Sequence, residues 1–484
     1  MIIMKMVMEM RMSLHEFLDD DVDLSKVNKS TYQILVAPNI TCASNLDKDS
    51  YVLVMENVIK SLNKIRDDLF FHIPITGYTK RLDFENTQQY IIKIPSFPNT
   101  MRCHYDVFTW NKFLDTREIE MDMIWTHLPE QASNIRNHIV NLYGTDIPIV
   151  CYSHWIESKE FNPGLTTSMY HNNITGMLQV KKCGLNTQTQ IDAILEEAEE
   201  HYSQKTIDKL KNIMIPLYLG IEDDRISKTV NTNTDKIIVF NHRPNDYRGW
   251  KPFLKVIKKL RSQRQDFKVF CSMLTANAFK HLNQELGEDY KLYFDTEGPD
   301  SRDEYMKKLS ECRVGFHAGT RWAMSSQDGL CNGVPYVFEI GKETGELFGN
   351  KMQTGFSDFS HSLDLLNKML DDNDFRNKQS QLALEHCSKV HSWNNRIKPF
   401  NNMLQEQLDN CKIIKDGERK NDIENYVKES KQVSTKQIRD WLGWGKQIEF
   451  SRYRNYLRTI DGIYTTMINK REYYIYNGEI HGKS

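Results

Sequence analysis

Residues 241–250 read NHRPNDYRGW and separate two segments with different patterns. The segment before them, Ile237–Phe240, is a short apolar run that predicts a buried strand. The segment after them, residues 250–262, has the composition of a helix. Parallel α/β sheets bind their ligands in the loops that follow the carboxyl ends of the strands. We therefore take residues 241–250 as the first candidate for a functional site.

Short strands and helices alternate in both halves of the chain, which favours an α/β fold with two parallel sheets. In the first half the expected strands are 32–37, 69–73, 90–94, 121–125 and 147–152, with helices at 50–60 and 131–142. In the second half the expected strands are 237–240, 267–271, 291–294, 314–316 and 335–338, followed by an amphipathic region at 375–408. Between the halves, the polar stretch 228–236 is the best candidate for a linker.

The composition is that of a globular protein with several domains. The chain has 484 residues, 39% hydrophobic and 26% charged, and a net charge of -2, so binding to nucleic acid would have to come from local charge. Nine scattered cysteines argue against a disulfide framework or structural zinc and favour a reducing cytosol. No apolar run is long enough to span a membrane. The Met-rich residues 1–30 are interpreted as an extension, and translation starts at Met1 or at Met12.

Two arginines in the 241–250 loop are candidates for an anion site. Arg243 and Arg248 are five positions apart and can converge on one phosphate group, for which the guanidinium fork is well suited. The alternative is that both are solvated surface residues.

A second candidate segment follows the expected strand 314–316. Gly319 begins a turn that leads into a helix, and the amides at a helix start attract phosphate. Asp328, one or two turns into this helix, can accept hydrogen bonds from a ribose diol, although it could equally be a surface carboxylate.

Together the two segments resemble the retaining GT-B glycosyltransferases related to glycogen synthase and sucrose synthase. That family has an arginine and a lysine five apart before a glycine, matched here by Arg243 and by Arg248 with Gly249. Asp328 occupies the second acidic position of the family motif, and residues 333–335 (GVP) complete it. The first acidic position falls on Thr320, which departs from the pattern. The resemblance covers residues 237–408, including a tryptophan of the closing helix at Trp393.

The resemblance implies two Rossmann-like domains that face a cleft. The donor would be a nucleoside diphosphate sugar, with a UDP-sugar favoured, and neither a cofactor nor a metal site is expected. The residues implied in donor binding are Arg243, Arg248, Gly319, Thr320 and Asp328. The expected domains are an N-terminal acceptor domain at 31–227 and a nucleotide-sugar domain at 234–412.

His154 is the candidate on the acceptor side. The sequence Tyr152-Ser153-His154 ends an expected strand and resembles the Tyr-x-His of bacteriophage DNA α-glucosyltransferase. His154, with Arg243 and Arg248, is therefore assigned to catalysis, whereas Glu157 is a weaker candidate. The alternative is a histidine that only packs at the end of a strand.

The tail, residues 420–484, predicts a separate winged helix-turn-helix. Ser434 and Gln437 have the spacing of a capping box, and Ile438 and Trp441 follow at helical spacing. A second helix is expected after Ser451, followed by a hairpin with strands 464–468 and 473–476. In this motif the second helix enters the major groove of DNA. The residues expected to contact DNA are Arg452, Arg454, Asn455, Arg458, Lys470 and Arg471.

Basic residues outnumber acidic ones about two to one from Lys431 onward, enough for phosphate contacts. A small domain for protein contact or dimerisation is the alternative interpretation of the tail. If the tail binds double-stranded DNA, the favoured acceptor is a hydroxymethylated pyrimidine in phage DNA, reached in the groove or flipped out of the stack. The other two hypotheses are a transferase that acts on a protein or glycan, and a DNA-binding regulator that senses a nucleotide sugar without turnover.

Overall fold

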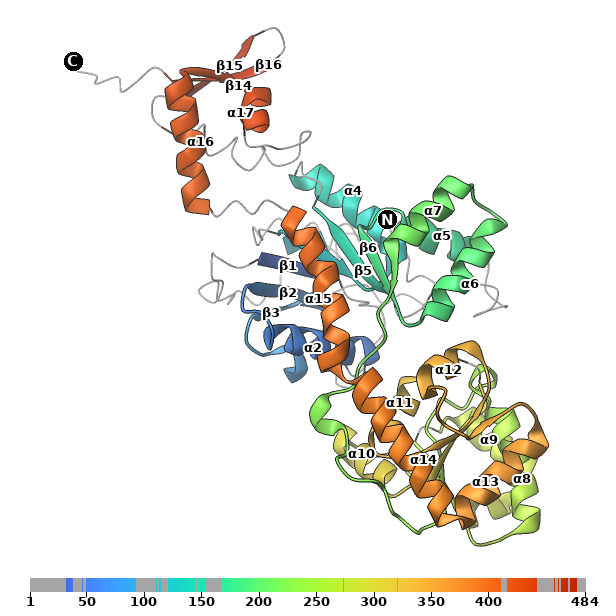
Figure 1. Cartoon of the computed structure of the whole chain (residues 1–484). Coiled ribbons are helices and arrows are strands. Elements are labelled where there is room, and N and C mark those ends of the chain that lie inside the picture. Colours follow the sequence, from blue (N-terminus) through green and yellow to red (C-terminus); the bar gives the residue numbers. More distant parts are fainter. Residues whose placement is uncertain are drawn as a thin grey trace, which may run out of the picture. The chain divides into compact units, whose positions relative to one another are not determined.

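The computed structural model shows an α/β protein with two parallel sheets and a small third sheet in the tail (Figure 1). It describes residues 32–37, 46, 49–92, 110, 113–114, 121–143, 147–153, 156, 167–272, 274–319, 321–410, 416–441, 457, 460, 463–468 and 471–476. These residues form two compact units. The first unit takes its described residues from 1–184, 201–214 and 401–484, and the second from 185–200 and 215–400.

The first sheet has seven strands in the order β3-β2-β1-β4-β5-β6-β7. Its strands are β1 (Tyr32–Ala37), β2 (Leu69–Ile75), β3 (Thr87–Ile91), β4 (Met123–Thr126), β5 (Ile149–Ser153), β6 (Lys182–Leu185) and β7 (Met214–Pro216). The helices are α2 (Ser50–Asn63), α4 (Ala132–Tyr143), α5 (Thr167–Met177), α6 (Gln188–Glu199) and α7 (Gln204–Ile213). Strands β1 to β5 pair in parallel. The expected strand–helix alternation is confirmed here.

The second sheet has six parallel strands in the order β10-β9-β8-β11-β12-β13. Its strands are β8 (Ile237–Phe240), β9 (Lys268–Cys271), β10 (Phe294–Asp295), β11 (Val314–His317), β12 (Tyr336–Glu339) and β13 (Gly355–Phe356). The helices are α8 (Trp250–Gln263), α9 (Ala276–Leu286), α10 (Arg302–Ser310), α11 (Met324–Cys331), α12 (Lys342–Phe348), α13 (Phe359–Asp371), α14 (Asn373–His386) and α15 (Trp393–Asn410).

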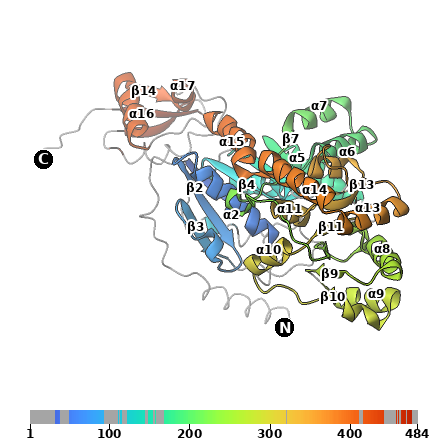
Figure 2. The same cartoon turned by 60° about the horizontal axis from the view of Figure 1, so that its bottom comes forward.

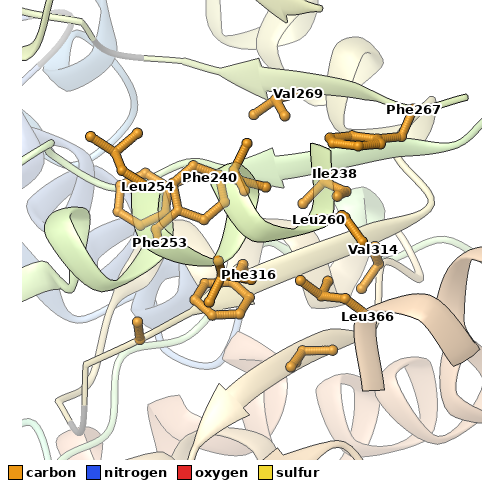
Figure 3. Packing of buried hydrophobic residues seen from close by; sticks show 14 of the residues in the cluster. Ile238, Phe240, Phe253, Leu254, Leu260, Phe267, Val269, Val314, Phe316 and Leu366 are labelled. Atoms are coloured by element: carbon orange, nitrogen blue, oxygen red, sulfur yellow. The ribbon is translucent and has the colours of Figure 1, made fainter. Parts of the chain in front are cut away.

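Alternate residues of the second sheet pack into two separate cores. Ile238, Phe240 and Phe316 point to the face covered by α8, α9 and α13 (Figure 3). Val239 and Tyr336 point to the face covered by α10, α11, α12 and α14. Helices α8 and α13 lie together on one side of the sheet (Figures 1 and 2). Burial on both faces explains why these strands are short continuous apolar runs.

The polar stretch 228–236 is bound to the second unit rather than loose. Asn231 donates from its side chain to the backbone oxygens of Ser310 and Cys312, at 3.0 and 3.1 Å. The buried guanidinium of Arg376 donates to the side-chain oxygen of Asn231 at 2.7 Å. The polar residues that suggested a linker therefore form hydrogen bonds with other residues of this unit.

One expected strand is shorter than predicted. Residues 291–294 were expected to be extended, but Glu288–Leu292 form a 3-10 turn and the strand begins at Phe294. Tyr290 and Phe294 are buried on either side of the exposed Leu292. Tyr293 is buried as well, so apolar residues of the turn and of the short strand follow one another in the sequence and resemble one longer strand.

The tail forms an antiparallel sheet with the order β14-β16-β15. Its elements are α16 (Asp416–Ser430), β14 (Gln432–Ser434), α17 (Thr435–Trp441), β15 (Ile463–Ile468) and β16 (Arg471–Tyr476). The predicted capping box is confirmed, because Ser434 Oγ accepts the N–H of Gln437 at 3.2 Å and Gln437 Oε1 accepts the N–H of Ser434 at 2.9 Å. The hairpin is also confirmed, whereas β14 was not predicted.

No helix in the part of the chain that the structure describes is both long and apolar enough to cross a membrane. Within the same residues, no three His, Cys, Asp or Glu side chains are grouped as metal ligands would be.

A buried histidine in the first unit makes stability depend on pH. His72 on β2 is 3% exposed and hydrogen-bonds to Gln33 and Tyr90, each at 2.8 Å. Burial lowers the pKa of His72 to about 4. Because the unfolded chain protonates near pH 6.5 and the folded chain does not, unfolding becomes easier as the pH falls from 6.5 to about 4.

We predict that His72→Gln, which keeps hydrogen-bonding groups but cannot titrate, reduces this pH dependence. Between pH 7 and pH 5 the unfolding free energy of the original chain should fall by about 2 kcal/mol more than that of the variant, since each pKa unit is worth about 1.4 kcal/mol. Urea unfolding at the two pH values measures the difference. Equal losses in the two proteins would contradict the assignment.

Candidate functional site

The candidate site lies at the carboxyl ends of β8 and β11, where the strand order of the second sheet reverses. From β8 the chain proceeds outward to β9 and β10, and it then returns to the other side of β8 with β11. Loops that leave such a point in opposite directions open a crevice that binds ligands in parallel sheets. Both segments selected from the sequence, 241–250 and 319–328, begin here.

Gly249 brings these two loops together. Its φ of 76° lies in the left-handed region that glycine favours. A Cβ at this position would lie 2.5 Å from both the Cβ and the backbone oxygen of Ala318, the residue that follows β11. Only glycine therefore permits the start of α8 to approach β11 so closely.

Arg248 contacts the second loop directly. Its Nη1 donates to the backbone oxygen of Trp322 at 2.7 Å. The structure thus brings Arg248 and the turn after Gly319 together at one edge of the sheet. Arg243 differs, because its side chain is exposed and makes no hydrogen bond or ion pair with any residue that the structure describes. One arginine is held against the protein, and the other is available to solvent or to a ligand.

His317 fixes the turn from the side of β11. Its Nε2 lies 2.9 Å from the backbone oxygen of Arg321, which can only accept, so Nε2 carries the proton. The other nitrogen, Nδ1, then accepts from Ser326 Oγ at 2.9 Å. Burial lowers the pKa of His317 to about 3, with Arg248 contributing in the same direction. The ring is therefore neutral near pH 7 and serves as a fixed hydrogen-bonding link.

His242 makes a similar link from β8. Its Nδ1 lies 2.7 Å from Ser325 Oγ, and its ring packs edge-on against His317 with centroids 4.7 Å apart. Burial holds the pKa of His242 well below its usual value, and His317 and Arg248 add to the effect. Two neutral histidines thus position the first turn of α11.

The start of α11 is turned toward the same edge. The residue before the helix, Ala323, has no side-chain group that could cap it, and no side chain among the described residues does so. The first backbone amides of a helix have no partner within the helix. These amides, beginning with that of Met324, are therefore suited to an anion.

Glu343 completes the turn and was not selected from the sequence. It lies in the first turn of α12, which follows β12, is 3% exposed, and accepts the N–H of Trp322 at 2.9 Å. Its other oxygen accepts from Thr187 Oγ1 at 2.8 Å within the same unit. Burial raises the pKa of Glu343, while its hydrogen bonds and the charges of Arg321 and Arg248 act in the opposite direction. No motif marks this residue, since its role depends on contacts between distant loops.

Asp328 lies inside α11 with its carboxylate held by an arginine. The guanidinium of Arg302, at the start of α10, donates to both oxygens at 2.6 and 2.8 Å. Asp328 is 6% exposed. Each oxygen retains a second lone pair that could accept another hydrogen bond. The assignment of Asp328 to a ribose diol remains a prediction.

A buried network of polar side chains links the start of α11 to the end of β8. Tyr336 donates from its hydroxyl to Asn241 Oδ1 at 3.0 Å, and the amide of Asn241 donates to Tyr305 at 3.0 Å and to the backbone oxygen of Ser325 at 2.5 Å. A Cβ on Gly329 would lie 2.2 Å from the Tyr336 hydroxyl. The glycine after Asp328 thus makes room for the tyrosine that anchors the end of β8.

Several predicted site residues lie outside the described residues. These are Thr320, His154 and Glu157 and, in the tail, Arg452, Arg454, Asn455, Arg458 and Lys470. Arg471 is the first residue of β16 and pairs with Ile468 through the backbone. The roles assigned to all of them remain predictions.

Comparison with solved structures identifies the fold. Anabaena HepE, solved with UDP and glucose, superposes with a TM-score of 0.60 over 78% of this chain and 100% of its own, at 11% identity. A glycosyltransferase from Rickettsia africae gives 0.57 at 14% identity over 78% and 99% of the chains. Sucrose-phosphate synthase from Thermosynechococcus elongatus gives 0.59 at 9% identity over 78% and 98%.

The chain therefore has the GT-B fold of these glycosyltransferases, as the resemblance implied. At such low identity the likeness concerns the fold. In comparisons of sequence, no family model and no curated protein matches the chain.

We predict that Gly249→Ala destabilises the second unit by about 2–4 kcal/mol, because it adds a side-chain collision to an unfavourable φ. Gly333→Ala is the matched control. Gly333 has a φ of 69°, but its nearest neighbour, Ser380 Oγ, would lie 3.0 Å from the new Cβ. This control should cost only about 1–2 kcal/mol. Urea unfolding compares the two, and equal losses would show that the approach to Ala318 is not tight.

Proposed function

We propose that the chain is a glycosyltransferase, a hexosyl- or pentosyltransferase that binds a nucleoside diphosphate sugar on its second unit. The observation that carries the proposal is the meeting of Arg248 with the turn that leads into α11, at the point where the strand order reverses. Support comes from HepE, a protein of the same fold that was solved with UDP and with UDP-glucose. A UDP-sugar is accordingly the first donor to test.

In this proposal the departing diphosphate is the main target of the site. As the bond to the sugar breaks, negative charge grows on the diphosphate, and groups already oriented toward that charge lower the barrier. Arg248 would act from its fixed position, and Arg243 from the surface. The amides at the start of α11 would add donors with Gly319 and Thr320 beside them, and Asp328 would accept from the ribose. The arginines supply the positive charge that this step needs without a metal ion.

The acceptor is a hydroxyl group, and we propose that it belongs to a hydroxymethylated pyrimidine in double-stranded DNA, such as modified phage DNA. The order β14-β16-β15, with α16 and α17 before the hairpin, agrees with a winged helix. The excess of basic residues after Lys431 suits contact with phosphates. His154, directly after β5, is proposed to face the donor sugar.

A glycan acceptor is the second candidate. It is favoured by one structural neighbour of the same fold, the lipopolysaccharide outer core galactosyltransferase WaaB, with a TM-score of 0.53. A regulator that binds the donor without turnover is favoured only by Thr320 in place of an acidic residue.

We predict that Arg243→Ala lowers kcat/KM by about 30- to 1000-fold, since one oriented donor is worth about 2–4 kcal/mol in the transition state. The stability of the protein should not change, because the side chain of Arg243 is exposed and bonds to no described residue, while its backbone hydrogen bond with Asn245 is kept in the variant. Initial rates with UDP-sugars and urea unfolding measure the two quantities.

Lys251→Ala is the matched control for Arg243. Lys251 is also an exposed cation near this loop, but its Nζ lies 2.7 Å from Asp246. Its removal should leave kcat/KM within about twofold, the effect of a screened surface pair. Equal losses in the two variants would mean that general charge, and not Arg243, assists the reaction.

The acceptor is identified by incubating the protein with labelled nucleotide sugars and DNA that contains or lacks hydroxymethylated pyrimidines. We expect label only in the modified DNA, and a variant with Arg452, Arg454 and Arg458 changed to alanine should lose most of it at 150 mM salt, because each phosphate contact contributes. Label in a glycan or protein, undiminished in that variant, would support the second candidate. Donor binding with no transfer would support the regulator.

A further inference from the structure

Glu343 is a carboxylate with an unusual position in the candidate site. A buried carboxylate is costly unless charges and hydrogen bonds compensate it. Here both oxygens accept hydrogen bonds, one from the N–H of Trp322 at 2.9 Å and one from Thr187 at 2.8 Å. Arg321 and Arg248 lie close enough for their charges to oppose the effect of burial, although burial is the larger effect and raises the pKa of Glu343.

Glu343 and Arg248 hold the same residue. Glu343 accepts the N–H of Trp322, and Arg248 donates to the backbone oxygen of Trp322 at 2.7 Å. A shift of the carboxylate would therefore shift the acceptor that orients Arg248. Arg321 is the residue before Trp322. The carboxylate of Glu343 therefore lies near two cations, one beside Trp322 in the sequence and one bonded to it.

We propose that Glu343 is a positioning residue of the donor site, which fixes residues 321–323 and balances the charges of Arg248 and Arg321 in place of the acidic residue that is absent at position 320. This inference rests on the proposed binding of a nucleoside diphosphate. It gives the carboxylate a role in tuning the site, because the balance keeps the empty site from holding the released diphosphate too tightly. A purely structural carboxylate would have no such effect.

The two roles predict different changes in the affinity for UDP when Glu343 is replaced by glutamine. The amide oxygen of glutamine can still accept the N–H of Trp322, so the turn keeps its anchor while one negative charge is lost. If Glu343 balances charge, two uncompensated guanidinium groups should bind UDP more tightly, with a dissociation constant about three- to tenfold lower at low salt. If the residue is only structural, the retained hydrogen bond keeps the turn in place, and the affinity for UDP stays within about twofold or falls. Titration calorimetry with UDP measures the constant.

Glu346→Gln is the matched control on the same helix. The carboxylate of Glu346 accepts from the backbone N–H groups of Gln188 and Thr189, at 3.0 and 2.9 Å, and makes no hydrogen bond with residues 321–323. The same substitution there should leave the affinity for UDP within about twofold. Tighter binding in both variants would attribute the effect to overall charge and overturn the proposal.

Arg321→Gln tests the proposal without touching the carboxylate. It removes one of the two balanced cations, so UDP should bind about three- to tenfold more weakly. This variant decides the matter if Glu343→Gln does not fold, because unchanged affinity in Arg321→Gln would overturn the proposal. If the unsubstituted protein bound neither UDP nor any other nucleoside diphosphate, the proposed function itself would be refuted.

Steady-state kinetics give a second test of the proposed charge balance. In Glu343→Gln both the KM for the donor and kcat should fall, because UDP is held more tightly before and after transfer. A structural defect would raise KM while it lowers kcat. A rise in KM would therefore count against charge balance even if the affinity for UDP were difficult to measure.

Discussion

The close approach of Gly249 to Ala318 is the constraint on which the candidate site depends. Adjacent strands β8 and β11 bring their carboxyl ends side by side, but loops with ordinary side chains would keep the following segments apart. With no Cβ and a φ of 76°, Gly249 lets α8 begin directly against the residue after β11. Arg248 is then placed within hydrogen-bonding distance of Trp322. Because Gly249 has no side chain, the loops that follow two adjacent strands can contact each other.

The groups around this contact form a site that is arranged before any ligand arrives. His242 and His317 are buried and neutral, so they hold the start of α11 by hydrogen bonds without adding charge. Positive charge is left to the arginines and to the helix start. Oriented donors of this kind act most strongly where water is excluded, and they need little reorganisation during reaction. The arrangement separates the residues that hold the loops from those that are available to a ligand.

The sequence predicted the elements of this half well because each leaves a local signal. Strand β8 has the predicted bounds, and α8 differs by one residue at its end, since an apolar run ends at Phe240 and a helical pattern begins after Gly249. The capping box at Ser434 was equally local. Glu343 was missed, because a carboxylate in the first turn of a short helix has no distinctive pattern in the sequence, and only the fold brings it beside Trp322. The pairing of Asp328 with Arg302 was missed for the same reason, as 26 positions separate the two.

The departure at Thr320 therefore bears less on catalysis than the sequence suggested. In a linear motif, an acidic position occupied by threonine favours a domain that binds a nucleotide sugar without using it. In three dimensions a carboxylate is present beside the same turn, contributed by another loop and held by Trp322 two residues further on. The proposed balance needs only a negative charge near two guanidinium groups, and the first turn of α12 carries such a carboxylate. The substitution of one letter in a motif is thus compatible with an unchanged balance of charge, which favours an enzyme over a sensor.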